Sequence, residues 1–352
     1  MITYRKTGGD VSPMREKPGI SDEQIRVCLS DEYGLSRTTV AFLPLGLDTN
    51  AGVYRVADVE GSPYLLKVKS GRLYEPSCLV PRYLRDQGIA QVVAPLPTNR
   101  GALWAGVGQW TAMLYPFIEG VAGWDPPMTG EHWEAVGAAL KRVHQVTLPS
   151  EGFESLRRET FDPAGYSRWI RAFEAQQAGS SGGSTSERAL RSLWLRHQPT
   201  IYAMVSSMEA LATMLQKHSG PYVVCHADLH PGNIIRDLAG GAFVVDWDDV
   251  MLAPKERDFI FAGGAPVDDS ARQDTSPFFA GYGQAEIDWR ALTYYLWERV
   301  VTDLIACAQD VFFRPDLEEE TKIEAVQLFS RILAEGGDVD TARAAAAHLN
   351  AV

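Results

Sequence analysis

The chain has 352 residues, 45% of them hydrophobic, and a formal net charge of −12 at pH 7. This composition excludes a largely disordered or collagen-like chain, and the negative charge argues against binding to nucleic acid or to anionic membranes. Four cysteines that lie far apart, without a CxxC pair, argue against a disulfide framework or a cysteine-based zinc site and indicate a reducing, cytoplasmic compartment.

The N-terminal third is predicted to form a small lobe, residues 21–114, built mainly from an antiparallel sheet. Residues 1–20 are polar and contain glycine and proline, so we expect a loose arm rather than a secretory signal. Short apolar runs between turn residues then indicate strands. The expected strands are 40–43, 52–56, 64–69, 91–94 and 112–115, and an amphipathic helix with Leu79, Tyr83 and Leu84 on one face should end near Gly88.

After the last of these strands the sequence changes to long helical periods. We expect a hinge at 115–120 and a larger helical lobe at 121–352, so the predicted fold class is α+β with two lobes. No apolar run approaches the roughly 18 residues of a membrane span. The expected helices are 131–146, 188–215, 289–308 and 318–334, with a Gly/Ser-rich loop at 176–186.

The segment 223–249 carries most of the side chains that point to chemistry. An apolar strand leads into a loop rich in histidine and aspartate, and two apolar runs around Gly240-Gly241 then predict a β-hairpin. A hairpin returns the chain to its start, so Asn233 at one foot and Asp246 at the other should lie side by side. A carboxylate and an amide oxygen held together suit Mg²⁺. Asp228 lies on the same loop, and its side chain can point toward the metal and the ligand bound to it.

The spacing Asp228-x-x-x-x-Asn233, then a hairpin, then Asp246 is the catalytic pattern of kinases. With His226-Ala-Asp228 in the place of a His-Gly-Asp signature, the segment resembles the aminoglycoside phosphotransferase family, whose fold is related to that of protein kinases. The chain departs from protein kinases because it has no Arg after the His, no Phe-Gly after the metal-binding Asp and no GxGxxG.

The resemblance covers about 40 to 310, and the run Asp246–Asp258 is most similar to the spectinomycin phosphotransferase branch. It implies a two-lobed protein-kinase-like fold and transfer of the γ-phosphoryl group of ATP (or GTP) to a hydroxyl group, with Mg²⁺ as cofactor. In that scheme Asp228 is the catalytic base, and Asn233 and Asp246 hold the metal. The implied acceptor is an aminocyclitol or aminoglycoside antibiotic, the role is resistance or metabolism, and the protein is a monomer or homodimer.

The resemblance also implies a set of nucleotide-binding residues. Lys67 would bind the phosphates of ATP, although Lys69 lies on the same strand face two residues later, so that the choice between them stays open. Glu75 would be the acidic partner of this lysine or simply a charge at a helix N-terminus. The loop covering the phosphates would include Gly46, Asn50 and Gly52, and the hinge that bonds the adenine would include Met113 and Tyr115.

Charge is distributed unevenly along the chain. Residues 1–118 carry 13 Lys and Arg against 11 Asp and Glu, whereas residues 119–352 carry 20 against 34. The acidic part suits a cationic small-molecule acceptor, although on charge alone the favoured explanation is acidity that only keeps the protein soluble. Asp248 and Asp249 would either clamp such an acceptor or cap a following helix.

Other functions remain to be compared with the kinase hypothesis. The cluster His226-x-Asp228-x-His230 could bind zinc in a hydrolase, but no second cluster of metal ligands appears in the sequence, and we expect His226 to be structural and to bond nearby backbone. A binding-only pseudokinase is a third hypothesis. A kinase of another small alcohol, of the choline, homoserine, sugar or macrolide type, is a fourth.

Overall fold

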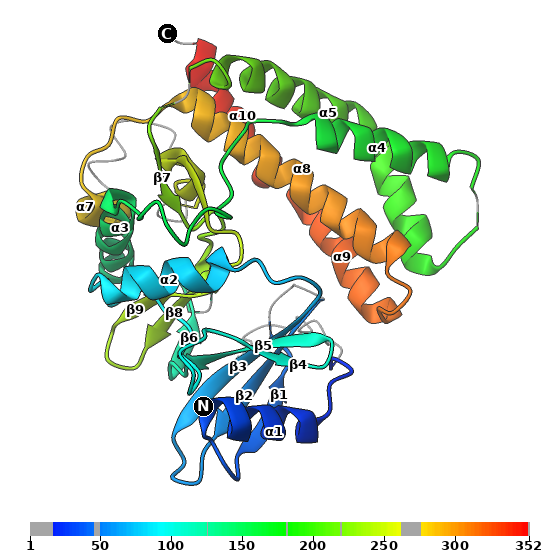
Figure 1. Ribbon diagram of the computed structural model, residues 1–352. Helices are drawn as coiled ribbons and strands as arrows, with labels where there is room; N and C mark the ends of the chain where they lie inside the picture. The colour runs from blue at the N-terminus through cyan, green and yellow to red at the C-terminus, as the bar shows by residue number, and fades with distance from the viewer. Residues whose placement is uncertain are drawn as a thin grey trace. The chain divides into compact units, whose positions relative to one another are not determined.

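A computed structural model describes residues 17–45, 50–124, 126–180, 182–218, 220–261 and 276–350 (Figure 1). The chain forms two compact units that differ from the predicted lobes, because the segment with the hairpin joins the N-terminal residues. The division at 115–120 therefore remains a prediction. The first unit consists of 1–157, 224–252 and 277–283, and the second of 158–223, 253–276 and 284–352.

The N-terminal residues form a five-stranded antiparallel sheet with the strand order β1-β2-β3-β5-β4 (Figure 1). This confirms the α+β class and four of the five expected strands in this region. In β2 the side chains alternate, with Tyr54 and Val56 fully buried, as expected of a strand with one covered face. The strands are β1 (Thr39–Leu43), β2 (Ala51–Ala57), β3 (Pro63–Ser70), β4 (Ala105–Val107) and β5 (Trp110–Pro116).

Helix α1 (Asp22–Tyr33) packs on one face of this sheet, and the sequence analysis missed it. A capping box fixes its start, because the Ser21 hydroxyl accepts from the Gln24 N–H while the Gln24 side chain accepts from the Ser21 N–H. The buried residues of the helix, Ile25 and Leu29 among them, share one apolar cluster with β2, β3 and β5. The Ser-x-x-Gln spacing was the available signal.

Helix α2 (Pro76–Asp86) is present where a helix was expected and ends just before Gly88, which has φ +82°. The predicted strand 91–94 is wrong as a sheet strand. Val92 instead makes a single parallel bridge with Val244, the Val93 N–H donates to the Val244 carbonyl at 3.0 Å, and the Val244 N–H donates to the Gln91 carbonyl at 2.7 Å. The apolar run is thus explained by packing against a distant segment, which periodicity does not reveal.

The hairpin predicted around Gly240-Gly241 is confirmed. It consists of β8 (Ile234–Asp237) and β9 (Ala242–Val244), and β6 (Gly120–Ala122) completes a three-stranded sheet in the order β6-β8-β9. A separate two-stranded sheet consists of β7 (Tyr222–Cys225) and β10 (Met251–Pro254).

Helices α3 (Gly130–Gln145) and α7 (Pro277–Tyr282) pack closely in the first unit through two glycines. A Cβ atom added at Gly137 would lie 2.1 Å from the Phe278 carbonyl oxygen, and one at Gly281 would lie 1.9 Å from the Glu134 carbonyl oxygen. Because backbone atoms occupy the space that a methyl group needs, these positions require glycine.

Substituting Gly137 with alanine should therefore lower thermal stability, by about 1–3 kcal/mol, because overpacking outweighs the better helix propensity of alanine. Gly165 in α4 (Ala164–Gln177) is the matched control, since no atom lies within 4 Å of its added Cβ. Gly165→Ala should leave the melting temperature unchanged or raise it. Equal melting temperatures for the two variants would contradict this explanation of Gly137.

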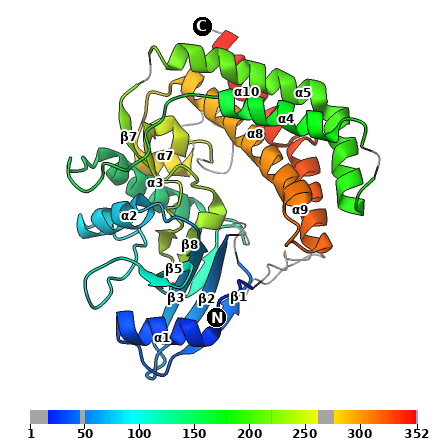
Figure 2. The same cartoon turned by 45° about the vertical axis from the view of Figure 1, so that its right-hand side comes forward.

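The second unit is mostly helical (Figure 2), in agreement with the expected helices at 188–215, 289–308 and 318–334. Helix α8 packs against α5, α9 and α10, and its Tyr294 and Tyr295 are fully buried, so these aromatic residues belong to the core. No helix within the described ranges has the length and apolar character to cross a bilayer. The remaining elements are α5 (Thr185–Leu215), α8 (Trp289–Phe313), α9 (Glu319–Ile332), α10 (Asp338–Ala347), η2 (Lys255–Asp258) and η4 (His348–Asn350).

Candidate active site

The hairpin brings the two predicted metal-binding residues together. The Val245 N–H donates to the Asn233 carbonyl at 2.9 Å, so Asp246 directly follows a residue that is hydrogen-bonded to Asn233. Asn233 itself ends the short helix η1 (Pro231–Asn233), immediately before β8. A local turn between two apolar strands is therefore sufficient to place Asn233 and Asp246 next to each other at the open end of the hairpin.

His226 connects the loop before the hairpin to the strand that leads into Asp246. Its Nε2 lies 2.9 Å from the Val245 carbonyl and must donate to it, while its Nδ1 accepts from the Asp228 N–H at 3.3 Å. The imidazole also packs edge-on against Trp247, with the ring centroids 4.7 Å apart. Because protein groups engage both ring nitrogens, His226 is structural, as expected, and poorly suited to be a zinc ligand.

Asp228 is oriented by two neighbouring side chains. The Asn233 Nδ2 donates to the Asp228 carbonyl at 2.9 Å and to its Oδ2 at 3.2 Å. The His230 Nε2 lies 3.5 Å from the same Oδ2, and His230 Nδ1 accepts from the Gly232 N–H at 3.0 Å. The side-chain contacts of Asn233 and His230 thus converge on Oδ2 of Asp228.

Two residues of the site have backbone conformations that non-glycine residues rarely adopt. Ala227 has φ +70° and Asp246 has φ +62°. The left-handed region costs an L-residue roughly 1–2 kcal/mol, which explains physically why a glycine suits the position of Ala227. Strained residues cluster at functional sites because the surrounding structure must hold them in place for a purpose. Ala227 directly precedes Asp228, so both unusual conformations lie in the backbone that carries the two aspartates.

Two lysines of β3 meet the segment after the hairpin. The Lys67 ammonium lies 2.8 Å from Asp246 Oδ1 and 2.8 Å from Asp248 Oδ2, and the Lys69 ammonium lies 2.7 Å from the same Asp248 oxygen. The side chain of Lys67 is 11% exposed, and that of Lys69 is 26% exposed. The structure thus gathers two cations and two anions, from residues far apart in sequence, beside the predicted metal site.

The pKa values of these groups follow from their mutual contacts. Burial alone would lower the pKa of Lys67, but Asp246 and Asp248 outweigh burial and hold its pKa above the usual value. Burial acts to raise the pKa of Asp248, whereas Lys67 and Lys69 lower it to about 2. Lys67 and Asp248 are therefore both charged at neutral pH.

The other acidic residues named from the sequence have different surroundings. Glu75 is exposed at the N-terminal end of α2, and in the described part of the chain it makes no ion pair with Lys67. Asp249 is mostly exposed and lies 3.5 Å from the Arg157 guanidinium. Asp248 is engaged by the two lysines. The partner of Lys67 in this structure is therefore a pair of aspartates after the hairpin rather than Glu75.

Of the residues expected to cover the phosphates, Gly52 lies in β2 and Asn50 directly precedes that strand. The Asn50 carbonyl accepts from the Ser70 N–H at 2.9 Å, and Gly52 lies so close to Pro18 that an added Cβ would be 2.3 Å from its Cγ. Gly46 falls outside the described residues.

The two expected hinge residues both lie in β5. Met113 is buried against Cys78 and Leu103, whereas Tyr115 is half-buried and its pKa is raised by burial.

Sequence reasoning missed a pair of residues, Tyr74 and Arg157, that form a clasp on the segment after the hairpin. The Arg157 guanidinium stacks on the Tyr74 ring at 4.0 Å and donates to the Asp248 carbonyl at 2.7 Å. The Tyr74 hydroxyl donates to the Val250 carbonyl at 2.9 Å and accepts from the Arg157 N–H at 2.8 Å. The clasp fixes both ends of the stretch from Asp248 to Val250. Neither residue lies in a recognisable motif, so no sequence signal was available.

Trp124 was also missed, although it touches the loop that carries Asp228. Its indole stacks on His230 with the ring centroids 5.8 Å apart, and a Cβ added at Gly232 would lie 2.6 Å from the indole nitrogen. The Gly123 N–H donates to the Pro231 and Ile234 carbonyls at 2.8 and 2.9 Å. The segment before α3 therefore supports the loop that carries Asp228, and the close approach of Trp124 explains the glycine at 232.

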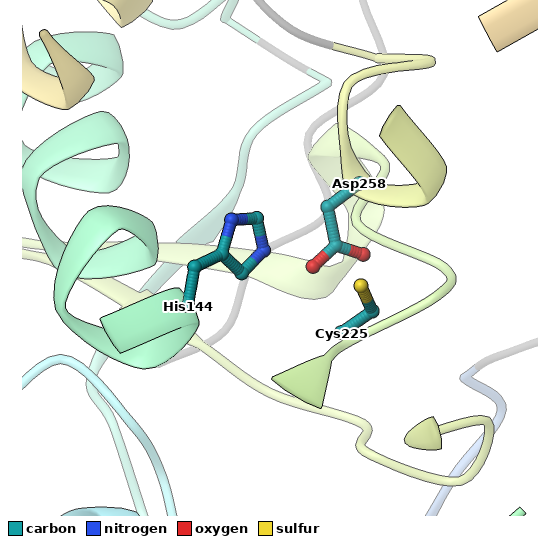
Figure 3. Close-up of side chains that lie close together, drawn as sticks. All are labelled: His144, Cys225 and Asp258. Carbon is teal, nitrogen blue, oxygen red and sulfur yellow. The ribbon is translucent and has the colours of Figure 1, made fainter. Parts of the chain in front are cut away.

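Buried residues underlie the start of this loop. Figure 3 shows the imidazole of His144 on α3 and the thiol of Cys225 at the end of β7, directly before His226. His144 Nδ1 lies 2.8 Å from the Tyr282 hydroxyl, so the histidine joins α3 to α7. All four cysteines are buried and none is in a disulfide, as expected from their spacing.

The donor set fits a hard divalent cation. The Asp246 carboxylate and the Asn233 amide oxygen are the oxygen ligands that Mg²⁺ prefers, and the amide nitrogen of Asn233 is already directed to Asp228. The neighbouring lysines provide positive charge for phosphate groups. Together these residues place carboxylates, an amide and two ammonium groups close to one another within one unit of the chain.

Comparison with known proteins identifies the group to which this arrangement belongs. The model of the phosphotransferase enzyme family matches residues 42–295. The chain belongs to this family. The prediction of a phosphotransferase that acts on a small molecule is thereby confirmed, as is the kinase-like fold expected from the resemblance.

Individual relatives place the chain within the phosphotransferase family. The crystal structure of a spectinomycin phosphotransferase in complex with ADP and spectinomycin has 29% sequence identity and a TM-score of 0.82, covering 94% of this chain and 99% of that one. The AMP-bound complex of a spectinomycin phosphotransferase has 27% identity and a TM-score of 0.78, covering 92% and 98%. Protein StrN of Streptomyces griseus is 25% identical over 197 residues, which cover 53% of this chain and 57% of that relative's length.

Proposed function

We propose that the protein transfers the γ-phosphoryl group of ATP, or GTP, to a hydroxyl group of a cationic antibiotic of the aminocyclitol or aminoglycoside type, with a spectinomycin-like acceptor favoured. One observation carries the proposal: Asp228, Asn233 and Asp246 are brought together beside the two lysines, as phosphoryl transfer requires. The spectinomycin phosphotransferase that bound ADP and spectinomycin supports the choice of nucleotide and acceptor.

In the proposed reaction Asp228 accepts the proton of the acceptor hydroxyl as that oxygen bonds to the γ-phosphorus. The bond between the γ-phosphorus and the bridging oxygen breaks, and ADP leaves with the electron pair. Mg²⁺ held by Asn233 and Asp246 would neutralise phosphate charge. Little covalent chemistry is needed from the protein, so most of the rate comes from positioning the reactants and from charge stabilisation.

The charge distribution supports a cationic acceptor. Residues 119–352 carry 14 more acidic than basic residues, from 34 Asp and Glu against 20 Lys and Arg. Asp249, mostly exposed beside the catalytic segment, is one carboxylate that can meet an ammonium group of the acceptor. A kinase of another small alcohol, such as a choline, homoserine, sugar or macrolide kinase, uses the same phosphate chemistry and differs only in the acceptor.

A coupled assay of ADP release over a panel of aminocyclitols, aminoglycosides, amino alcohols, sugars and macrolides tests this proposal. We expect Mg²⁺-dependent ADP release that is fastest with an aminocyclitol such as spectinomycin. Turnover that is faster with an uncharged sugar or with choline would replace the proposed acceptor. Nucleotide binding without turnover of any acceptor would support a pseudokinase, and a tightly bound zinc ion in the purified protein would support a hydrolase.

A further inference from the structure

Two ammonium groups share one carboxylate oxygen in the first unit. Asp248 Oδ2 accepts from Lys67 at 2.8 Å and from Lys69 at 2.7 Å, so the two nitrogens are no more than the sum of these bonds, about 5.5 Å, apart. Like charges held at this separation repel each other unless anions lie between them. Asp248 is the anion that both share in this structure, and Lys67 has Asp246 in addition.

The strand register places Lys69 nearer than Lys67 to the loop expected to cover the phosphates. Lys67 is opposite Val53 of β2, whereas Lys69 is opposite Ala51, which lies between the loop residues Asn50 and Gly52. The next residue of β3, Ser70, donates its N–H to the Asn50 carbonyl. Because β2 and β3 are antiparallel, each step along β3 toward its end approaches the loop.

We propose that Lys69 is a second nucleotide-binding lysine, so that Lys67 and Lys69 together bind neighbouring groups of the triphosphate, and that Asp248 holds the two lysines side by side. The proposal rests on the function proposed above and deepens it. Lys67 and Lys69 need not be alternatives for one role, because both ammonium groups reach the same oxygen, Asp248 Oδ2.

The burial of the two lysines explains why they need an anion at all times. Their side chains are 11% and 26% exposed, so an unpaired ammonium at either position would lose hydration without compensation. Asp248 supplies the compensation in the structure described here, and a bound triphosphate supplies more charge than one carboxylate. The carboxylate also prevents the lysines from moving apart, which lowers the entropy cost of binding the nucleotide.

Calorimetric titration of the full chain with ATP and with AMP, in the presence of Mg²⁺, tests this inference. Lys69→Met should raise the Kd for ATP about tenfold, a typical effect of losing one charge-assisted contact, and leave the Kd for AMP close to that of the unmodified protein. Lys69→Arg should keep most of the ATP affinity because it keeps the charge. Lys217→Met removes an exposed lysine of the second unit and should change neither value.

Three results would overturn the inference. The first is an unchanged ATP affinity in Lys69→Met. The second is an equal loss of ATP and AMP affinity in Lys69→Met, which would indicate general damage to the sheet. The third is an equal loss of ATP affinity in Lys69→Arg and Lys69→Met. Failure of the proposed function gives a different result, because the unmodified protein would then bind no nucleotide or release no ADP.

Discussion

Replacing Asp228 with asparagine should lower kcat for acceptor-dependent ADP release by a factor on the order of 10²–10⁴, the usual contribution of a general base. Asparagine has the same shape, and its side-chain oxygen can still accept from the Asn233 amide that now donates to Asp228 Oδ2. The variant should therefore fold normally and bind ATP nearly as well as the unmodified protein. Steady-state kinetics together with ATP titration would separate the two effects.

Asp86→Asn is the matched control for the loss of one carboxylate in the first unit. Asp86 is the last residue of α2 and pairs only with Arg82 on the same exposed helix face among the contacts described. This variant should retain the full kcat. If Asp228→Asn retained it as well, the assignment of the base would be wrong, and a KM effect alone would indicate that Asp228 only binds the acceptor.

Replacing Asp246 with asparagine should produce the second large effect, a loss of Mg²⁺-dependent turnover on the order of 10³-fold. A metal that neutralises phosphate charge contributes several kcal/mol to the transition state, and each 1.4 kcal/mol corresponds to a factor of ten. The apparent Mg²⁺ affinity should fall with kcat. Measuring ADP release against Mg²⁺ concentration, with calorimetry of Mg²⁺-dependent ATP binding as a second readout, would show this.

Two further observations make the Asp246 prediction specific. Excess EDTA should stop turnover by the unmodified protein, and added Mg²⁺ should restore it. Higher Mg²⁺ concentrations should recover part of the activity of Asp246→Asn, because an amide oxygen is a weaker ligand than a carboxylate but still a hard one. A variant with normal Mg²⁺ dependence would place the metal elsewhere.

The core of the candidate site could be predicted from sequence because it is local. Asn233 and Asp246 are joined by a short hairpin, and the glycine pair between two apolar runs is a strong signal for that turn. Here the neighbours in space are also close along the chain.

The failures are long-range. Glu75 was the nearest acidic residue with a suitable helix, yet Lys67 contacts Asp246 and Asp248, which are 179 and 181 residues away in sequence. Tertiary packing decided this pairing, and neither propensity nor periodicity carries that information. The clasp formed by Tyr74 and Arg157 was missed for the same reason, since it depends on a contact 83 residues apart.

The bridge between Val92 and Val244 has a consequence for how the protein is made. The first unit is discontinuous in sequence. The ribosome therefore synthesises residues 158–223 before β9, the hairpin strand to which Gln91–Val93 are hydrogen-bonded. The apolar run 91–94 therefore stays uncovered until the hairpin has been synthesised, a situation that slows folding and exposes intermediates to aggregation. Production of an N-terminal fragment alone should give poorly soluble protein, and co-expression with chaperones should benefit the full chain.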